Sequence, residues 1–297
     1  MGSKELIVVI LTYNEEKHLA RCIASVLDVA SSILVVDSFS TDNTREVAEK
    51  HGAAFVQNVF VNQAQQINFA LTIIPSGFKW VLRIDADEYL SPSLAESISQ
   101  VIKHNDSHDG FYLKRRMAFG GRLINYGGIF PVEVLRLFRA GRGICEERWM
   151  DEHILVSGKV GSLQGELIDD NLNTLTWWIQ KHNQYSNREA VEILLRRNKL
   201  RGKVDMPLAG RAGLKRLVKN KIYAHLPVVP KVLAYFLYRY VFRFGFLDGK
   251  QGFAFHFLQG FWYRFLVEAK VQEVERYMAA NGDSLDCAAE KILRIKL

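Results

Sequence analysis

Three acidic side chains lie close together at the end of the segment Trp80 to Glu88, whose sequence is Trp-Val-Leu-Arg-Ile-Asp-Ala-Asp-Glu. The carboxylates of Asp85, Asp87 and Glu88 come directly after a short apolar run, as at the tip of a buried strand. Carboxylates this close repel one another unless a positive charge lies between them. Mg²⁺ or Mn²⁺ would suit that position, and a nucleotide diphosphate would supply further oxygen ligands. Because Asp-x-Asp also occurs by chance about once in a chain of this length, the neighbouring segments decide its meaning.

Two earlier apolar runs also end in polar residues. The run 6–11 is followed by Thr-Tyr-Asn-Glu, and the run 33–36 is followed by Asp37. Hydrophobic periodicity predicts strands at 6–11, 33–36, 53–56 and 80–84, alternating with helices at 18–29, 44–51 and 63–72. Such an alternation predicts an α/β fold with a mainly parallel sheet, in which ligands bind beyond the carboxyl ends of the strands. No Gly-x-Gly-x-x-Gly follows the first run and no Walker-type loop occurs, which disfavours the common dinucleotide and P-loop sites.

Taken in order, these segments resemble family-2 glycosyltransferases, which have a GT-A, Rossmann-like nucleotide-sugar-binding fold. The resemblance covers the first third of the chain and rests on residues 9–16, 34–44, 66–71 and 80–88. It implies a nucleotide-sugar site formed by Thr12, Tyr13, Glu15, Asp37, Gln66, Asp85 and Ala86. Thr12, Tyr13 and Glu15 would line the nucleoside pocket, and Asp37 would bind the uracil or ribose region. Asp85 would contact ribose or metal-bound water, and Asp87 would ligate the Mg²⁺ or Mn²⁺ that bridges the diphosphate.

Structural alternatives exist for several of these residues. Tyr13 could be an aromatic packed at a strand end, and Asp37 could form a turn or cap a helix. Gln65, Gln66 and Asn68 could equally form the polar face of a helix.

A second acidic cluster, Glu146 to His153, precedes a predicted strand at 154–156. Inverting sugar transfer needs a carboxylate that takes the proton of the acceptor hydroxyl. The resemblance places this base at Asp151 or Glu152, with Asp151 favoured, although the family has Glu-Asp where this chain has Asp-Glu-His. His153 is a candidate metal ligand, or else a structural or solvated histidine.

The stretch between these clusters is rich in arginine. Extended segments are predicted at 110–116, 120–129 and 132–139. The cations are Arg115, Arg116, Arg122, Arg136, Arg139 and Arg142. They could form a solvated basic face, or they could neutralise a departing diphosphate or an anionic acceptor.

The C-terminal third is basic and aromatic. Residues 201–250 contain eleven Lys or Arg and two acidic residues, a local excess of nine, against +7 for the whole chain. The charges interrupt every apolar run before it reaches the roughly 20 residues that span a bilayer. The composition favours helices lying in the headgroup layer of an anionic membrane. The region could instead be buried core or a dimer contact, and 244–253 could be a helix–turn–helix connection. Nucleic-acid binding is disfavoured because no such motif accompanies the charges.

These observations predict three regions: a nucleotide-sugar-binding half at 1–105, an acceptor-binding half at 106–200, and a helical membrane-associating region at 201–297. No secretory signal is recognised. The three cysteines are widely spaced and fit no zinc motif, which indicates a reducing cytosol.

We therefore expect an inverting, metal-dependent hexosyltransferase, peripheral on the inner face of the cell membrane. Its donor would be a nucleotide sugar, such as a UDP-sugar, and its acceptor a lipid-linked, lipopolysaccharide or exopolysaccharide glycan. The alternatives are a polyprenyl-phosphate sugar synthase, which needs no base, and a catalytically silent membrane adaptor. Homo-oligomer formation is left open.

Overall fold

The structure, a computed structural model, describes residues 5–104, 107–147, 153–197 and 227–297. The chain divides into two compact units, Met1–Leu172 and Asn173–Leu297, each with its own hydrophobic core. Helix α5 (Leu175–Arg197) belongs to the second unit, whereas the sequence places it in an acceptor-binding half that ends at 200. The division into functional halves at 105 and 106 remains a prediction.

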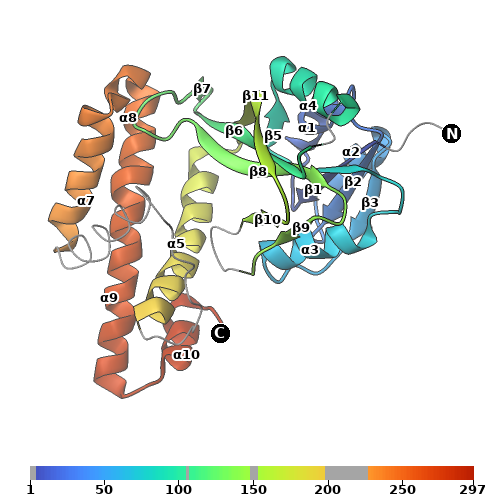
Figure 1. The fold of residues 1–297 in the computed structure, drawn as a ribbon. Coiled ribbons are helices and arrows are strands. Elements are labelled where there is room, and N and C mark those ends of the chain that lie inside the picture. Colours follow the sequence, from blue (N-terminus) through green and yellow to red (C-terminus); the bar gives the residue numbers. More distant parts are fainter. Residues whose placement is uncertain (1–4, 105–106, 148–152, 198–226) are drawn as a thin grey trace. The chain divides into compact units, whose positions relative to one another are not determined.

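The first unit opens with the strand–helix alternation that the sequence predicts, with ends shifted by a few residues (Figure 1). Its elements are β1 (Leu6–Thr12), α1 (Leu19–Val26), β2 (Ser32–Asp37), α2 (Thr44–Lys50), β3 (Ala54–Gln57), α3 (Gln63–Ile73) and β4 (Trp80–Asp85). The continuous apolar run of β1 is explained by its position, because a central parallel strand is covered on both faces.

The remainder of this unit departs further from the prediction. Its elements are β5 (Glu88–Leu90), α4 (Pro92–His104), β6 (Gly110–Phe119), β7 (Arg122–Leu123), β8 (Val132–Arg139), β9 (Gly143–Cys145), β10 (Ile154–Val156) and β11 (Val160–Asp169). The sequence predicts neither α4 nor β11, and of the extended segment expected at 120–129 only β7 pairs with another strand.

One large sheet joins the two parts of the unit. Its order is β3-β2-β1-β4-β8-β6-β11-β5, with β7 paired to β6. The first four strands are parallel, as predicted. Strand β8 runs antiparallel to both β4 and β6, β11 is parallel to β6, and β5 is antiparallel to β11. The sheet is therefore mixed, with its longest parallel block at the N-terminal side.

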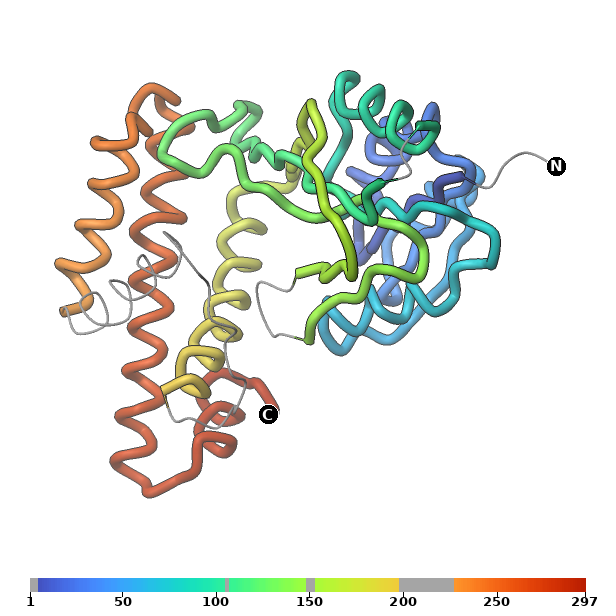
Figure 2. Tube along the Cα trace, viewed as in Figure 1, coloured from blue at the N-terminus to red at the C-terminus, as the bar shows by residue number. Residues whose placement is uncertain are grey.

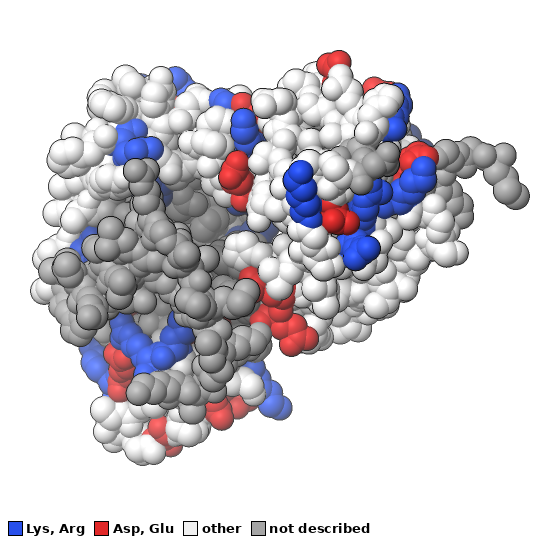
Figure 3. Space-filling view, viewed as in Figure 1, with Lys and Arg blue, Asp and Glu red and all other residues white. Residues whose placement is uncertain are grey.

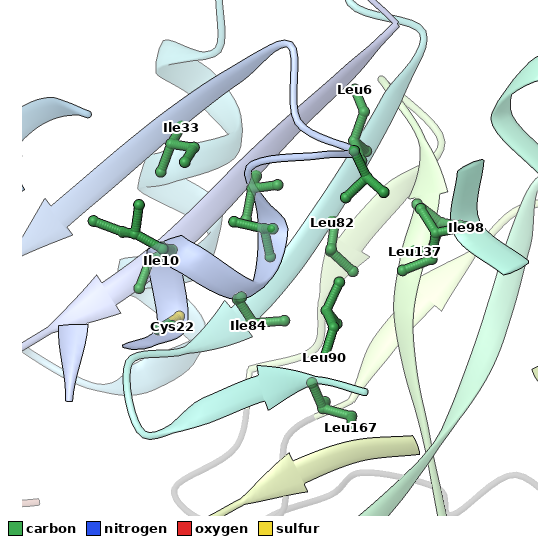
Figure 4. Close-up of a cluster of buried hydrophobic side chains, with 14 of the residues drawn as sticks. Leu6, Ile10, Cys22, Ile33, Leu82, Ile84, Leu90, Ile98, Leu137 and Leu167 are labelled. Carbon is green, nitrogen blue, oxygen red and sulfur yellow. The ribbon is translucent and has the colours of Figure 1, made fainter. Parts of the chain in front are cut away.

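Alternate residues of β1 point to opposite faces of the sheet and enter separate hydrophobic cores. Leu6 and Ile10 pack with Leu82 of β4 and with α1 and α4 (Figure 4). On the other face, Ile7 packs with Ile67 of α3. Burial on both sides fixes the register of the parallel strands, and so fixes where their carboxyl ends lie.

The second unit is helical. Besides α5 it contains α7 (Val228–Leu237), α8 (Gly249–Phe257), α9 (Tyr263–Asn281) and α10 (Leu285–Ala288). A short π-helical turn at Tyr238–Phe242 continues α7, and the two together form the α7 rod. A second π-helical turn at Leu258–Trp262 connects α8 to α9, and these three form the second rod. A 3₁₀ turn at Gly245–Asp248 joins the two rods. Helices α5 and α9 lie side by side (Figure 2). Within the described residues, no helix combines the length and the apolar character needed to cross a membrane.

Candidate active site

The carboxyl ends of three parallel strands lie side by side at one edge of the sheet. Thr12 at the end of β1 is in register with Asp37 at the end of β2, and Leu11 is in register with Asp85 at the end of β4. The expectation that these polar tips share one rim is thus confirmed. The rim collects side chains from segments more than seventy residues apart in the chain.

The loop after β1 is hydrogen-bonded to the loop after β2. Asn14 adopts a left-handed conformation (φ 56°), and its side-chain oxygen accepts a hydrogen bond from the backbone N–H of Thr41 at 2.8 Å. The backbone N–H of Glu15 donates to Oγ1 of Thr44 at 2.8 Å. Tyr13 is 58% exposed beside these contacts. Tyr13 is therefore not the packed aromatic of the structural alternative, and its ring is accessible to a ligand.

Asp37 is fully buried and surrounded by protein donors. Its carboxylate accepts hydrogen bonds from Oγ1 of Thr12 at 2.9 Å, from the backbone N–H of Ser40 at 2.8 Å, from Oγ of Ser40, and from Nε2 of Gln57 at 3.2 Å. This geometry matches the turn-forming alternative, because the Asp37 carboxylate accepts the backbone N–H of Ser40, three residues on, and so closes the turn after β2. Asp37 holds the rim together, and its contact with uracil or ribose remains a prediction.

Asp85 lies between two guanidinium groups. Arg83 donates to both carboxylate oxygens, at 2.7 and 3.1 Å, and Arg136 donates to Oδ2 at 3.0 Å. Arg136 also donates to Glu88 at 2.9 Å. Both arginines are almost completely buried. Arg83 and Arg136 therefore neutralise the carboxylates of Asp85 and Glu88. These two carboxylates do not require a metal ion between them.

Glu88 is a structural member of this network. One of its oxygens accepts the backbone N–H of Asp85 at 2.9 Å, and Nη1 of Arg115 lies 3.8 Å from the other. Burial raises the pKa of Glu88 well above its usual range, and the Asp85 carboxylate adds to the rise, while Arg115 and Arg83 oppose it. Arg136 is therefore not on a solvated face, and its action on a diphosphate or an anionic acceptor remains a prediction.

Asp87 has different surroundings from Asp85. Its Oδ2 accepts a hydrogen bond from Nδ2 of Asn171 at 3.0 Å, and its backbone oxygen accepts the N–H of Asp170 at 3.1 Å. Arg21 of α1 binds Asp170 through its carboxylate and its backbone oxygen. These hydrogen bonds hold Asp170 and Asn171, which follow β11, against the tip of β4. Among the described residues no ion pair to Asp87 is found, so Asp87 is the carboxylate most suited to an added cation.

A buried histidine connects the first loop to the same segment. Nδ1 of His18 lies 2.6 Å from a carboxylate oxygen of Glu15, and Nε2 accepts the backbone N–H of Leu172 at 2.8 Å. Because Nε2 acts as an acceptor, the ring proton lies on Nδ1 and is donated to Glu15. Glu15 is therefore oriented by His18, which fixes it beside the predicted nucleoside pocket.

Two of the predicted nucleotide-sugar ligands are internal. Gln66 is buried, exchanges hydrogen bonds with Asn58 and donates one to Oγ of Ser38. Ala86 is buried in the core beneath the rim. The residue of α3 that reaches the acidic tip is Gln63, whose Nε2 lies 3.4 Å from Oδ1 of Asp85.

The second acidic cluster is described only in part. Asp151 and Glu152 lie outside the described residues, so the choice between them as base remains a prediction. His153 is exposed, and its Nδ1 lies 2.8 Å from Oε1 of Glu146. Across the described ranges no group of three or more His, Cys, Asp or Glu side chains is arranged to hold a metal ion. The role of His153 as a metal ligand beside Asp87 therefore remains a prediction.

The donor set at Asp87 nevertheless fits Mg²⁺ or Mn²⁺. Such ions bind proteins through one or two carboxylates and take their remaining ligands from water and substrate phosphates. Asp87 offers a partly exposed carboxylate whose hydrogen-bond partner among the described residues is the Asn171 amide, whereas Asp85 is paired with two arginines. A metal would accordingly be held by Asp87.

The sequence does not single out Arg83, His18 or Asn171, all of which shape the rim. Arg83 had a detectable signal: it is a cation inside an otherwise apolar strand, two residues before Asp85 and so on the same face. His18 meets Leu172 across 154 residues and Asn171 meets Asp87 across 84, and no local pattern marks such pairs.

The sequence profile of the family described as Glycosyl transferase family 2 matches residues 7–150. The lipopolysaccharide core biosynthesis glycosyltransferase LpsC of Rhizobium meliloti (strain 1021) is 32% identical over 193 residues, covering 61% of this chain and 68% of LpsC. An uncharacterized glycosyltransferase of Rickettsia bellii (strain RML369-C) is 36% identical over 114 residues, and this match spans only 38% of each protein.

Among solved structures, the chain is similar to glucosyl-3-phosphoglycerate synthase from Mycobacterium tuberculosis, in a complex with Mn²⁺, uridine diphosphate and glucosyl-3-phosphoglycerate. The sequence identity is 23% and the TM-score is 0.33, with 40% of this chain and 45% of that chain covered.

Proposed function

This chain belongs to glycosyl transferase family 2, and within that family we propose that it is an inverting, metal-dependent hexosyltransferase that uses a UDP-sugar. The observation that carries the proposal is the common rim of β1, β2 and β4, where exposed Tyr13 and the Asp87 carboxylate follow adjacent parallel strands. A rim of this kind is where open α/β sheets bind nucleotides.

The donor would lie along this rim. The exposed Tyr13 ring offers a stacking surface for the base, and Glu15, held by His18, offers an acceptor for ribose hydroxyls. Arg115 lies 3.8 Å from Glu88 and 4.0 Å from Asp169. Thr12 and Asp37 form the hydrogen-bonded base of the site.

The chemical step is attack of an acceptor hydroxyl oxygen on the anomeric carbon, with departure of the nucleoside diphosphate from the opposite side. Asp151 or Glu152 would take the hydroxyl proton as the new glycosidic bond forms. A divalent ion held by Asp87, when bound, would neutralise the charge that develops on the leaving diphosphate.

We propose a lipid-linked or lipopolysaccharide-type glycan as the acceptor, used at the inner face of the cell membrane. Two observations support this choice. The relative LpsC carries lipopolysaccharide core biosynthesis in its name and matches this chain over 68% of its own length. The C-terminal third is basic and aromatic, as expected for a protein that works at an anionic membrane surface.

The test is turnover of a panel of nucleotide hexoses by the wild type and by Asp87→Asn. We expect UDP release by the wild type that depends on added Mn²⁺ or Mg²⁺. In the variant, kcat/KM should fall by about a hundredfold or more, because the carboxylate that would hold the cation opposite the diphosphate is lost. Asp28→Asn, at an exposed carboxylate of the same unit, is the matched control and should keep full activity.

The base is tested separately with Asp151→Asn and Glu152→Gln. One of the two should lower kcat by about a hundredfold while binding of the nucleotide sugar, measured by calorimetry, is retained. Full turnover in both variants would contradict a base-assisted hydroxyl acceptor and would favour a phosphate nucleophile. Full turnover by Asp87→Asn in the presence of chelator would contradict the metal role.

A further inference from the structure

The turn between the two rods of the helical unit exposes an unusual concentration of large apolar side chains. We call residues 241–247, which connect the α7 rod to α8, the hairpin tip. Phe242 is 71% exposed, Phe244 57% and Leu247 49%. Val241 and Phe246 are also exposed, and Gly245 is the tip's buried residue. Five exposed large apolar side chains within seven consecutive residues form an apolar surface patch, and such patches are typical of interaction sites.

The backbone under the tip is held in place from inside the unit. Gly245 packs so closely against the buried His256 ring that an added Cβ would lie 2.7 Å from it. Phe244 has a left-handed conformation (φ 59°), and its side chain is exposed. The Phe246 ring meets those of Tyr240 and Phe244 with centroids 6.3 and 6.2 Å apart. The exposed rings are thus presented by a packed turn.

The charges around the tip have one sign. Arg243 in the tip and Lys250 just after it are exposed. In residues 228–265 the single acidic side chain is Asp248, which is fully buried. On the face drawn in Figure 3, the region over α7 and α8 shows scattered Lys and Arg and no Asp or Glu. The exposed surface near the tip therefore complements an anionic partner.

We propose that the hairpin tip is a membrane anchor, whose apolar side chains enter the headgroup layer of an anionic bilayer while Arg243 and Lys250 contact lipid phosphates. Exposed rings interleaved with cations are the pattern that binds interfaces, and each cation adds attraction to anionic lipid. This inference rests on the proposed membrane-linked acceptor and names the part of the chain that would bring the enzyme to it.

The test is co-sedimentation of the full-length protein with phosphatidylcholine vesicles, with and without phosphatidylglycerol. The tip variant combines Phe242→Ser, Phe244→Asn and Leu247→Ser, with Asn chosen because it tolerates the left-handed backbone at 244. We expect its partition onto the anionic vesicles to be about tenfold weaker or more. Arg243→Gln with Lys250→Gln should weaken binding about fivefold per charge at low salt.

The matched control is Val229→Ser with Phe265→Ser, two exposed apolar residues of the same unit outside the tip, which should bind vesicles as the wild type does. Equal binding by the tip variant and the control would overturn the proposal. So would a wild-type dimer, seen by light scattering, that the tip variant abolishes without any change in vesicle binding.

UDP-sugar hydrolysis by the same samples separates the two proposals. A tip variant that hydrolyses the UDP-sugar normally but no longer binds the vesicles supports the anchor. Absence of hydrolysis by the wild type counts against the proposed activity alone.

Discussion

At the scale of single residues, the acidic tip of β4 contains two kinds of carboxylate. Asp85 and Glu88 are partners of buried arginines, while Asp87 points to Asn171 and is available to a ligand. The Asp-x-Asp pattern in the sequence does not distinguish Asp85 from Asp87. Their environments separate a structural role for the first from a ligand-binding role for the second.

Arg136 is the residue on which the buried network depends. Replacing it by Met leaves Glu88 buried without its nearest cation, and breaking a buried ion pair on one side costs about 3–5 kcal/mol. Urea unfolding should show a loss of this order for Arg136→Met. Arg142→Met removes a cation that is 61% exposed and lies 4.0 Å from Asp109, so its effect should stay within about 0.5 kcal/mol. Equal stability of the two variants would show that Arg136 is not essential to the network.

Asn171 positions the Asp87 carboxylate through its 3.0 Å hydrogen bond. Asn171→Ala should weaken Mn²⁺ binding, measured by calorimetry without donor, by about tenfold, which is the usual effect of losing an outer-shell partner. Asn171→Gln, which keeps the amide, should recover part of the loss. Asn281→Ala, in the helical unit, is the control and should bind Mn²⁺ as the wild type does. Unchanged Mn²⁺ affinity in Asn171→Ala would leave Asn171 with no part in the metal site.

At the scale of elements, the pairing of β11 with β6 changes register between Ser162 and Glu166, and this irregularity fits β11 against α4. Gly165 lies in the irregular part with φ 90°, and an added Cβ would be 2.3 Å from the backbone nitrogen of Leu94. Gly165→Ala must therefore displace α4, and we expect a loss of more than about 2 kcal/mol in urea unfolding. Gly121→Ala has a similar φ of 75° with open space around it, so its cost should be near 1 kcal/mol, roughly that of backbone strain. A smaller loss at Gly165 than at Gly121 would contradict the close approach.

The elements that the sequence predicts correctly are those whose patterns are local. The apolar run of β1 and the polar residues after it define both a buried strand and its tip without reference to the rest of the chain. Strand β11 has no such pattern, because its residues alternate between exposed and buried irregularly around the change of register. The sequence does not indicate the structural pairing of Arg136 for the same reason, since its carboxylate partners lie 48 and 51 residues away.

At the scale of the whole molecule, the chain combines a sheet unit that contains the match to the family profile with a helical unit that lies beyond that match, which ends at residue 150. The cores of the two units share no residues. Their stabilities can therefore respond to conditions separately, and pH is one condition to which the helical unit should respond.

Burial lowers the pKa of His256 to about 4, and Arg239 adds to the decrease while Asp248, 3.9 Å away, opposes it. A histidine in the unfolded chain titrates near 6.5, so between these values the unfolded state binds a proton that the folded state does not. The contribution of neutral His256 to the free energy of unfolding is therefore fully present above about pH 7 and decreases as the pH falls, by about 2 kcal/mol at pH 5.

His256→Leu should remove this pH dependence when urea midpoints are compared at about pH 5 and about pH 8. His104→Gln, at an exposed histidine of α4, should leave it unchanged. A wild-type midpoint that rises on acidification would mean that His256 is not held neutral in the folded unit.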